Sequence, residues 1–279
     1  MSKILNKENL APEIDLFTID APLIAAKAQP GHFVIARASE RGERIPLTIV
    51  DYDRDAGNID LVVQAVGSST MEFCSLEVGD ELLDLLGPLG EPIEIKEIGT
   101  VVCVAGGLGV APVYPKAKYL KKAGNKIISI VGAQTEEMII MKDKMEDISD
   151  EIYFSTDDGS LGEKGFTTDI LTALLEERAD EIDEVVAVGP AVMMKAASEV
   201  TADYDLDTIV SLNPIMIDGT GMCGGCRVTV DGETLFACVD GPAFDGHAVD
   251  FDELMMRQTH YQTQEEKAKH NCKIDKEVG

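Results

Sequence analysis

Three cysteines in one short glycine-rich segment are the residues of this chain best suited to chemistry. Cys223 and Cys226 form a C-x-x-C pair with only glycines between them, so the backbone can turn tightly and direct both thiols to one centre. Cys238 follows a predicted β-hairpin over residues 228–236, which turns at Asp231-Gly232. A loop followed by a returning hairpin strand can bring three thiolates to one metal site.

A fourth ligand is expected, because both zinc and a [2Fe-2S] cluster take four. Asp218 precedes Cys223 so that the segment reads D-x4-C-x2-C-x11-C. This spacing is close to the plant-type iron–sulfur pattern, with aspartate in place of the first cysteine. It favours an iron–sulfur cluster, while zinc and a set of three buried thiols without metal remain alternatives.

A second candidate site comes from the middle of the chain, where apolar strands alternate with helices. Strands are predicted at 100–105, 126–131, 152–155, 184–188 and 208–212, and helices at 112–123, 138–148, 168–177 and 192–200. This alternation predicts a doubly wound α/β domain with a parallel sheet. Ligands of such sheets bind where the strands end at their carboxyl termini.

Loops with nucleotide-binding character follow these strands. The first strand ends in G-G-L-G-V-A-P, which is near G-x-G-x-x-G with Pro112 at the third glycine, a position that suits the first turn of a helix. Gln134, Glu136 and Glu137 follow the second strand and would not favour a ribose 2′-phosphate, so NAD is preferred over NADP. The glutamates could instead serve as charges at a helix N-terminus.

Residues before 97 predict a small antiparallel β-barrel, because short strands alternate with turns and no long helical period occurs. Its expected strands are 15–19, 32–36, 46–52, 58–66 and 81–85. A Gly-Ser-Ser-Thr turn at 67–70 offers free N–H groups and hydroxyls for a pyrophosphate, with a helix expected after it. An ordinary turn is the alternative.

Charge and hydropathy exclude several classes of function. The formal net charge of −27 argues against nucleic acid and anionic membranes as partners. The N-terminus lacks the apolar core of a signal peptide, and no apolar run reaches membrane-spanning length, so a cytoplasmic protein is expected. Its cysteines are then ligands and free thiols rather than disulfides, with Cys103 in the core. Residues 251–279 predict a short helix and tail, either frayed or an arm for a partner subunit.

The order of these motifs resembles one known superfamily over nearly the whole chain. A barrel, then G-G-L-G-V-A-P, T-D-D-G-S and V-G-P-A-V-M-M, then the cysteine segment, resembles the ferredoxin–NADP reductase superfamily, close to the dihydroorotate dehydrogenase B electron-transfer subunits. Asp218 with three cysteines resembles the family of small (alpha) subunits of NADH-dependent reduced ferredoxin:NADP oxidoreductase, also called sulfide dehydrogenase.

The resemblance implies a division of the chain and a cofactor for each part. We expect an FAD-binding β-barrel at 1–97, an NAD-binding α/β domain at 98–213, a [2Fe-2S] segment at 214–250 and a C-terminal helix and tail at 251–279. The implied cluster ligands are Asp218, Cys223, Cys226 and Cys238. The implied FAD contacts are Arg44, Pro46, Leu47, Thr48, Gln64, Gly67, Ser69 and Thr70. The implied NAD(H) contacts are Gly106, Gly107, Gly109, Asp157, Asp158 and Gly189.

The resemblance also implies an activity and a partner. A hydride would pass between NAD(H) and FAD, single electrons would pass to the [2Fe-2S] cluster, and no side-chain nucleophile would be needed. The partner would be a large subunit with a second flavin, [4Fe-4S] clusters and an NADP site, forming an electron-bifurcating heterodimer that reaches ferredoxin indirectly. The alternatives are a dihydroorotate dehydrogenase B-type electron-transfer subunit, a stand-alone NADH reductase and a flavin/iron–sulfur redox sensor.

Overall fold

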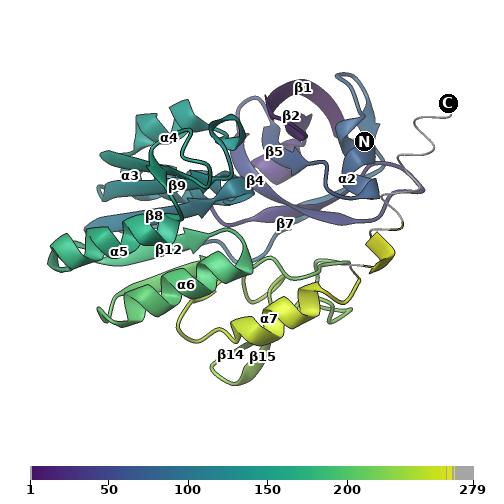
Figure 1. Ribbon diagram of the computed structural model, residues 1–279. Helices are drawn as coiled ribbons and strands as arrows, with labels where there is room; N and C mark the ends of the chain where they lie inside the picture. The colour runs from purple at the N-terminus through teal and green to yellow at the C-terminus, as the bar shows by residue number, and fades with distance from the viewer. Residues whose placement is uncertain (1, 262, 266, 268–279) are drawn as a thin grey trace.

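The N-terminal part of the chain folds into an antiparallel sheet that curls into a nearly closed barrel (Figure 1). The computed structural model describes residues 2–261, 263–265 and 267. The strands lie in the order β6-β1-β2-β5-β4-β3-β7. They span β1 Ser2–Ala11, β2 Ile14–Asp20, β3 Phe33–Arg37, β4 Ile45–Asp53, β5 Asn58–Gln64, β6 Glu81–Leu82 and β7 Asp84–Leu89, with short helices α1 Pro22–Ala25 and α2 Ser68–Cys74.

Several details of the barrel differ from the sequence prediction. The strand predicted at 81–85 is divided into β6, which pairs with β1, and β7, which pairs with β3. Strand β1 was not expected, because Ser2–Ala11 is mostly polar and exposed and lacks a regular apolar alternation. Helix α2 begins at Ser68 rather than after Thr70, because the Thr70 hydroxyl accepts hydrogen bonds from the backbone N–H groups of Val66 and Gly67 and so caps the first turn.

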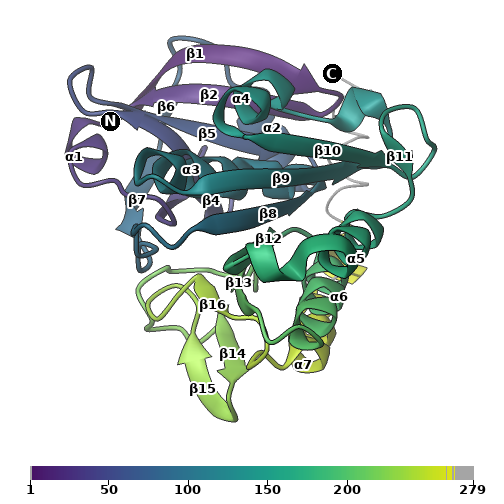
Figure 2. The ribbon, with the colours of Figure 1, turned by 90° about the vertical axis from the view of Figure 1, so that its left-hand side faces the viewer.

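The second sheet is parallel except at one edge, as the α/β prediction required (Figure 2). Its order is β11-β10-β9-β8-β12-β13-β16. The strands are β8 Thr100–Gly106, β9 Lys126–Ala133, β10 Glu151–Thr156, β11 Glu163–Lys164, β12 Glu184–Val188, β13 Asp207–Ser211 and β16 Ala243–Asp245. The helices are α3 Val110–Lys122, α4 Lys142–Ile148, α5 Thr167–Arg178 and α6 Ala191–Ala202, with 3₁₀ turns at Gly107–Gly109, Glu136–Met138 and Ala179–Glu181.

The helix predicted over 138–148 is wrong in its first turn. The structure has a 3₁₀ turn at Glu136–Met138 instead, and α4 starts only at Lys142. Met141 separates the two with a φ of 54°, a left-handed conformation that interrupts a right-handed helix. The apolar run Met138–Met141 therefore packs as an irregular segment against the sheet.

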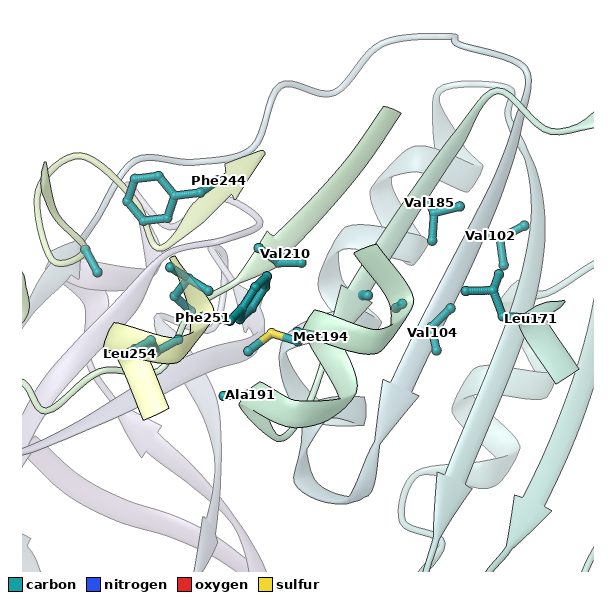
Figure 3. Packing of buried hydrophobic residues seen from close by; sticks show 14 of the residues in the cluster. Val102, Val104, Leu171, Val185, Ala191, Met194, Val210, Phe244, Phe251 and Leu254 are labelled. Carbon is teal, nitrogen blue, oxygen red and sulfur yellow. The ribbon is translucent and has the colours of Figure 1, made fainter. Parts of the chain in front are cut away.

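Alternate residues of β8 build the two faces of the second sheet. Val102 and Val104 pack with α5 and α6, whereas Val101, Cys103 and Ala105 pack with α3 and with barrel residues. Figure 3 shows the first of these clusters, which continues across Met194 of α6 to residues after the cysteine segment. The fully buried Cys103 confirms its predicted place in the core.

Contacts between α3 and the barrel strand β4 join the two sheets. Lys118 Nζ of α3 donates to both carboxylate oxygens of Asp51, at 2.8 and 2.6 Å. Beside this ion pair the rings of Tyr52 and Tyr119 stack with 5.8 Å between their centroids. These contacts fix the barrel relative to the parallel sheet, and so determine the shape of the cleft between them.

The cysteine segment packs against both sheets. The predicted hairpin is confirmed as β14 Arg227–Val230 and β15 Glu233–Phe236, with Asp231 and Gly232 at positive φ as a type I′ turn requires. Strand β16 then adds antiparallel to β13, and helix α7 Phe251–Gln258 lies beside α6 and β14. Within the described residues, none of the helices combines the length and apolarity needed to cross a lipid bilayer.

Lys116 is a buried charge whose removal should stabilise the fold. Its ammonium group in α3 is inaccessible and has no hydrogen-bond partner in the described part of the chain, and burial lowers its pKa to about 8. We expect Lys116→Leu to raise the free energy of unfolding by about 3 kcal/mol at neutral pH, because the unfolded lysine titrates near pH ~10.4. Urea denaturation measures the difference.

The pH dependence of this gain identifies its cause. Between pH ~8 and pH ~10.4 the unfolded chain binds the proton that the folded chain has released, so the wild-type protein gains stability as pH rises through this window. The advantage of Lys116→Leu is therefore complete below pH ~8 and lost towards pH ~10. The exposed Lys122, changed to leucine, is the control and should shift stability by less than about 0.5 kcal/mol. An equal effect of both variants would contradict the burial explanation.

Candidate functional site

The four predicted cluster residues lie together as two pairs. The Cys223 thiol donates to Asp218 Oδ1 at 3.1 Å, and Cys226 Sγ lies 3.1 Å from Cys238 Sγ. Cys226 and Cys238 are buried, whereas Cys223 is exposed. A [2Fe-2S] cluster takes two protein ligands on each iron, which matches this pairing.

Glycines allow the ligand loop to approach the barrel. Gly219 has a φ of 75°, and a Cβ at this position would lie 2.7 Å from side-chain atoms of both Ile35 and Leu89. Strands β3 and β7 therefore lie directly beneath the loop. Gly221, with a φ of 82°, similarly leaves room for Val239. The glycines that accompany the cysteines in the sequence are thus required by turn geometry and by close packing.

Asp218 is oriented as a ligand. Its Oδ2 accepts hydrogen bonds from the Thr220 hydroxyl at 2.8 Å and from the Met222 N–H at 3.2 Å, which leaves Oδ1 directed at Cys223. The hydrogen bond from Cys223, followed by those from Thr220 and Met222, lowers the pKa of Asp218 to about 2. The group is therefore a carboxylate at neutral pH and able to bind a cation.

The donor set fits an iron–sulfur cluster better than a single zinc ion. The four side chains form two pairs, Asp218 with Cys223 and Cys226 with Cys238, whereas a single zinc ion draws its ligands around one point. Burial raises the pKa of Cys238 to about 12, so a metal is needed to keep this sulfur as thiolate. Two pairs side by side suit the two irons of a cluster.

A cleft of about 1000 Å³ opens at the carboxyl ends of β8, β9, β10 and β12, between the parallel sheet and the barrel. The predicted NAD(H) residues Gly106, Gly107, Gly109, Asp157 and Gly189 line this cleft. Asp158 is not a lining residue of the cleft; its carboxylate accepts from the Ser160 N–H and hydroxyl, which lowers its pKa. The predicted convergence of strand-end loops on one crevice is therefore observed.

Close backbone packing accounts for the glycine-rich loop. A Cβ at Gly109 would lie 2.1 Å from the carbonyl oxygen of Val188, so only glycine fits between β8 and β12. Gly107 has a φ of 55° and open space around it. The loop then enters α3 with Pro112 in its first turn, as predicted. Met193 also lines the cleft, whereas its neighbour Met194 is buried in the core.

Ser155 is a cleft residue that the sequence prediction missed. It is the penultimate residue of β10, two residues before the predicted Asp157; it is buried, and its hydroxyl has no protein partner within the described residues. A buried hydroxyl without a partner costs free energy unless a ligand satisfies it. The orphaned Oγ therefore fits a nucleotide with ribose and phosphate oxygens. Its position immediately before the T-D-D-G loop was the available signal in the sequence.

Ser155→Ala should weaken NADH binding without destabilising the protein. Loss of one neutral hydrogen bond is expected to raise the Kd for NADH about 3- to 10-fold, as measured by isothermal titration calorimetry. Ser129→Ala is the matched control, because this buried serine bonds Ser149 at 2.6 Å and lies outside the cleft. It should lower stability by about 1 kcal/mol and leave Kd unchanged. The reverse pattern would exclude Ser155 from the nucleotide site.

The barrel wall of the cleft suits a flavin ring. Ile14, Phe33, Pro46, Leu47 and Val62 make it apolar. Its polar lining groups are Thr48 and Gln64, both predicted flavin contacts. A planar apolar ring with polar edges fits such a surface.

The other predicted FAD residues lie outside the cleft lining. Arg44 forms a 3.1 Å ion pair with Asp84. The Ser69 hydroxyl accepts from the Glu43 N–H at 3.0 Å, and Thr70 caps α2. Beside them, a Cβ at Gly67 would meet no atom closer than 3.9 Å, which leaves room for a ligand group. Their contacts with FAD stay a prediction.

Known families match both halves of the site. The family described as the iron–sulfur cluster binding domain of dihydroorotate dehydrogenase B matches residues 213–250. The oxidoreductase NAD-binding domain family matches residues 103–199. The expected iron–sulfur and NAD-binding parts of the chain are therefore confirmed.

Similar proteins cover nearly the whole chain. A dihydroorotate dehydrogenase B (NAD(+)) electron transfer subunit homolog from Thermotoga maritima is 47% identical over 265 residues, covering 95% of this chain and 93% of its own length. The dihydroorotate dehydrogenase B (NAD(+)) electron transfer subunit of Geobacillus sp. is 32% identical over 250 residues, covering 86% and 94%.

Solved structures agree with the fold. The chain is similar to the structure of an NADH-dependent reduced ferredoxin-NADP oxidoreductase, which was solved to study flavin-based electron bifurcation. The two share 45% identity and a TM-score of 0.92, and the match covers 97% of each chain. Phthalate dioxygenase reductase, at 15% identity and a TM-score of 0.62 over 90% of this chain and 97% of its own, supports the fold alone. The predicted order of barrel, parallel sheet and cysteine segment is thus confirmed.

Proposed function

Because the chain belongs to the family of dihydroorotate dehydrogenase B electron-transfer subunits and their homologues, we propose that it is the small subunit of an electron-bifurcating NADH-dependent ferredoxin:NADP oxidoreductase. At the coarser level it is an oxidoreductase-family electron-transfer subunit with NAD-binding and iron–sulfur domains. Its cofactors are FAD, NAD(H) and a [2Fe-2S] cluster. The 45% identity to the bifurcating oxidoreductase over 97% of both chains supports the finer assignment.

The cofactors supply the redox chemistry when bound: hydride exchange between NADH and FAD, then one-electron transfer through the cluster. The protein contributes geometry. Gly106, Gly107 and Gly109 line the cleft at the start of α3 and would hold the nucleotide backbone, and Thr48 and Gln64 would bond the polar edge of the flavin. The apolar wall around Phe33 would exclude water from the space between nucleotide and flavin.

One observation carries this function: the ligand loop and the cleft share a barrel strand. Phe33 of β3 lines the cleft, and Ile35 of the same strand lies against Gly219, one residue after Asp218. The proposed flavin site and the proposed cluster site would therefore be neighbours through β3. An arrangement of this kind suits conversion of a two-electron donor into single electrons.

The segment boundaries at residues 97, 213 and 250 remain part of the proposal, as do the individual cofactor contacts. The absence of a cationic group from Gln134, Glu136 and Glu137 supports NAD over NADP. The proposed partner is a larger flavin and [4Fe-4S] subunit that carries the NADP site and reaches ferredoxin. Co-purification of the native complex, followed by mass spectrometry of its chains, tests this assignment.

A dihydroorotate dehydrogenase B-type electron-transfer subunit is the second candidate. Relatives described by that name at 31–38% identity support it. The two assignments differ in the partner that co-purifies, which would then be a dihydroorotate-oxidising enzyme. A complex that oxidises dihydroorotate with NAD+ as the electron acceptor, and does not react with ferredoxin, would favour this second candidate over the first.

Asp218→Cys tests the carboxylate ligand. We expect the variant to keep a [2Fe-2S] spectrum with a more negative midpoint potential, because thiolate donates more electron density to iron than carboxylate does. Asp240→Asn is the matched control, since it removes one negative charge two residues after the proposed ligand Cys238, where Asp240 accepts a hydrogen bond from the Phe236 N–H. A midpoint shift no larger than that of Asp240→Asn would argue that Asp218 is not a ligand.

A further inference from the structure

Two arginine side chains donate hydrogen bonds to consecutive peptide carbonyls of the C-G-G-C loop. Arg227 Nη1 donates to the Gly224 carbonyl at 3.1 Å, and Arg257 Nη2 of α7 donates to the Gly225 carbonyl at 3.2 Å. These carbonyls lie between two proposed ligands, Cys223 and Cys226. Both cations therefore contact the loop that holds the sulfurs.

The first of these peptide units also contacts a ligand sulfur. The Gly225 N–H belongs to the same peptide as the Gly224 carbonyl, and it donates to Cys223 Sγ at 3.4 Å. A cation on the carbonyl end polarises the peptide and strengthens the N–H donor at its other end. Hydrogen bonds to cluster sulfurs and nearby positive charge are factors that set cluster potentials.

Helix α7 holds Arg257 against the loop at several points. Asp250 caps its first turn by accepting from the Glu253 N–H, and the Thr229 hydroxyl of β14 donates to Glu253 at 2.5 Å. Phe251 and Leu254 are buried in the core cluster that contains Met194 of α6, and Figure 3 shows Met194 facing both side chains. Helix α7, Phe251–Gln258, is thus packed onto the cluster segment rather than frayed; residues 262, 266 and 268–279 lie outside the described residues.

We propose that α7 belongs to the cluster site because it positions Arg257 against the ligand loop. Arg257 and Arg227 then act as positioning residues that raise the midpoint potential of the cluster. The inference rests on the proposed function, because it presupposes the cluster at Asp218, Cys223, Cys226 and Cys238. It assigns a role to α7 that neither the ligand spacing nor the nucleotide motifs require. The positive charges oppose the strongly negative net charge of the chain at the point where an electron arrives.

Redox titration followed by paramagnetic resonance tests the proposal with Arg257→Gln, Arg257→Lys and Arg227→Gln. Each glutamine variant should lower the ratio of reduced to oxidised cluster at a fixed potential about 3- to 10-fold, which is roughly 30–60 mV for one electron. Arg257→Lys keeps the charge and should shift less than Arg257→Gln. Iron content should stay at the wild-type level, so that the shift reports the potential rather than loss of the cluster.

Lys195→Gln is the control, because it removes the same charge from the contact between α6 and α7. There Lys195 Nζ lies 2.7 Å from Asp252 Oδ1, and it makes no contact with the C-G-G-C loop among the hydrogen bonds of the described residues. An unchanged midpoint in both glutamine variants, or an equal shift in Lys195→Gln, would overturn the inference while leaving the cluster assignment intact. A wild-type protein without a [2Fe-2S] signal would instead overturn the proposed function.

Discussion

Cys238→Ser is expected to abolish the [2Fe-2S] cluster and with it electron transfer beyond the flavin. Cys238 is buried and pairs with Cys226 at 3.1 Å, so its loss leaves one iron with a single buried protein sulfur. The rate of cluster-dependent reduction of an acceptor should fall at least about 100-fold. Replacing a residue that only supports a metal ligand costs up to about 100-fold, and loss of a ligand itself should cost at least as much. Iron analysis and visible absorbance measure cluster content.

The flavin half of the site provides the internal control for this variant. Bleaching of FAD by NADH should continue in Cys238→Ser, because the nucleotide cleft lies across β3 from the ligand loop. Cys74→Ser is the matched substitution, since Cys74 ends α2 in the barrel, outside the ligand segment, and should keep its full iron content. A Cys238→Ser protein with wild-type iron would remove Cys238 from the ligand set.

Gly109→Ala should disable the nucleotide site while leaving the cluster intact. The added methyl group would lie 2.1 Å from the Val188 carbonyl oxygen and 2.7 Å from its carbon, and neither is a flexible side-chain end. The loop must move away from β12, and a displacement of about 1 Å at a reacting site costs up to ~10²-fold in rate. We expect stopped-flow reduction of the flavin by NADH to slow about 10- to 100-fold.

Two readouts show whether the effect is local. The chemical reductant dithionite should still reduce both FAD and the cluster of Gly109→Ala, and the visible spectra of the oxidised cofactors should match the wild type. NADH reduction at the wild-type rate in a correctly folded Gly109→Ala protein would show that this loop does not hold the nucleotide.

Local patterns in the sequence predicted the elements whose residues act on their neighbours in the chain. The D-x4-C-x2-C-x11-C spacing predicted a group that the fold brings together as pairs. The glycine-rich loop predicted the sharp turn between β8 and α3, and Asp231-Gly232 predicted the β14–β15 hairpin. In each case short-range geometry and periodicity decide the structure, so a single sequence contains the information.

Features that depend on distant residues were missed. The mostly polar β1 is a strand because β2 and β6 pair with it, and its own pattern does not predict this. The contact of Arg257 with the Gly225 carbonyl joins residues far apart in the chain, and Ser155 became significant only when its hydroxyl proved to lack a partner among the described residues. Arg44 and Asp158 were predicted from motif position, and the structure gives both other polar partners.

The most direct test of the account is anaerobic titration of the purified protein with NADH, followed by visible and paramagnetic-resonance spectroscopy after metal analysis. The account predicts iron rather than zinc, bleaching of the flavin, and growth of a reduced [2Fe-2S] signal that disappears in Cys238→Ser. Zinc at the cysteines, or flavin bleaching without any cluster signal in an iron-loaded protein, would contradict it.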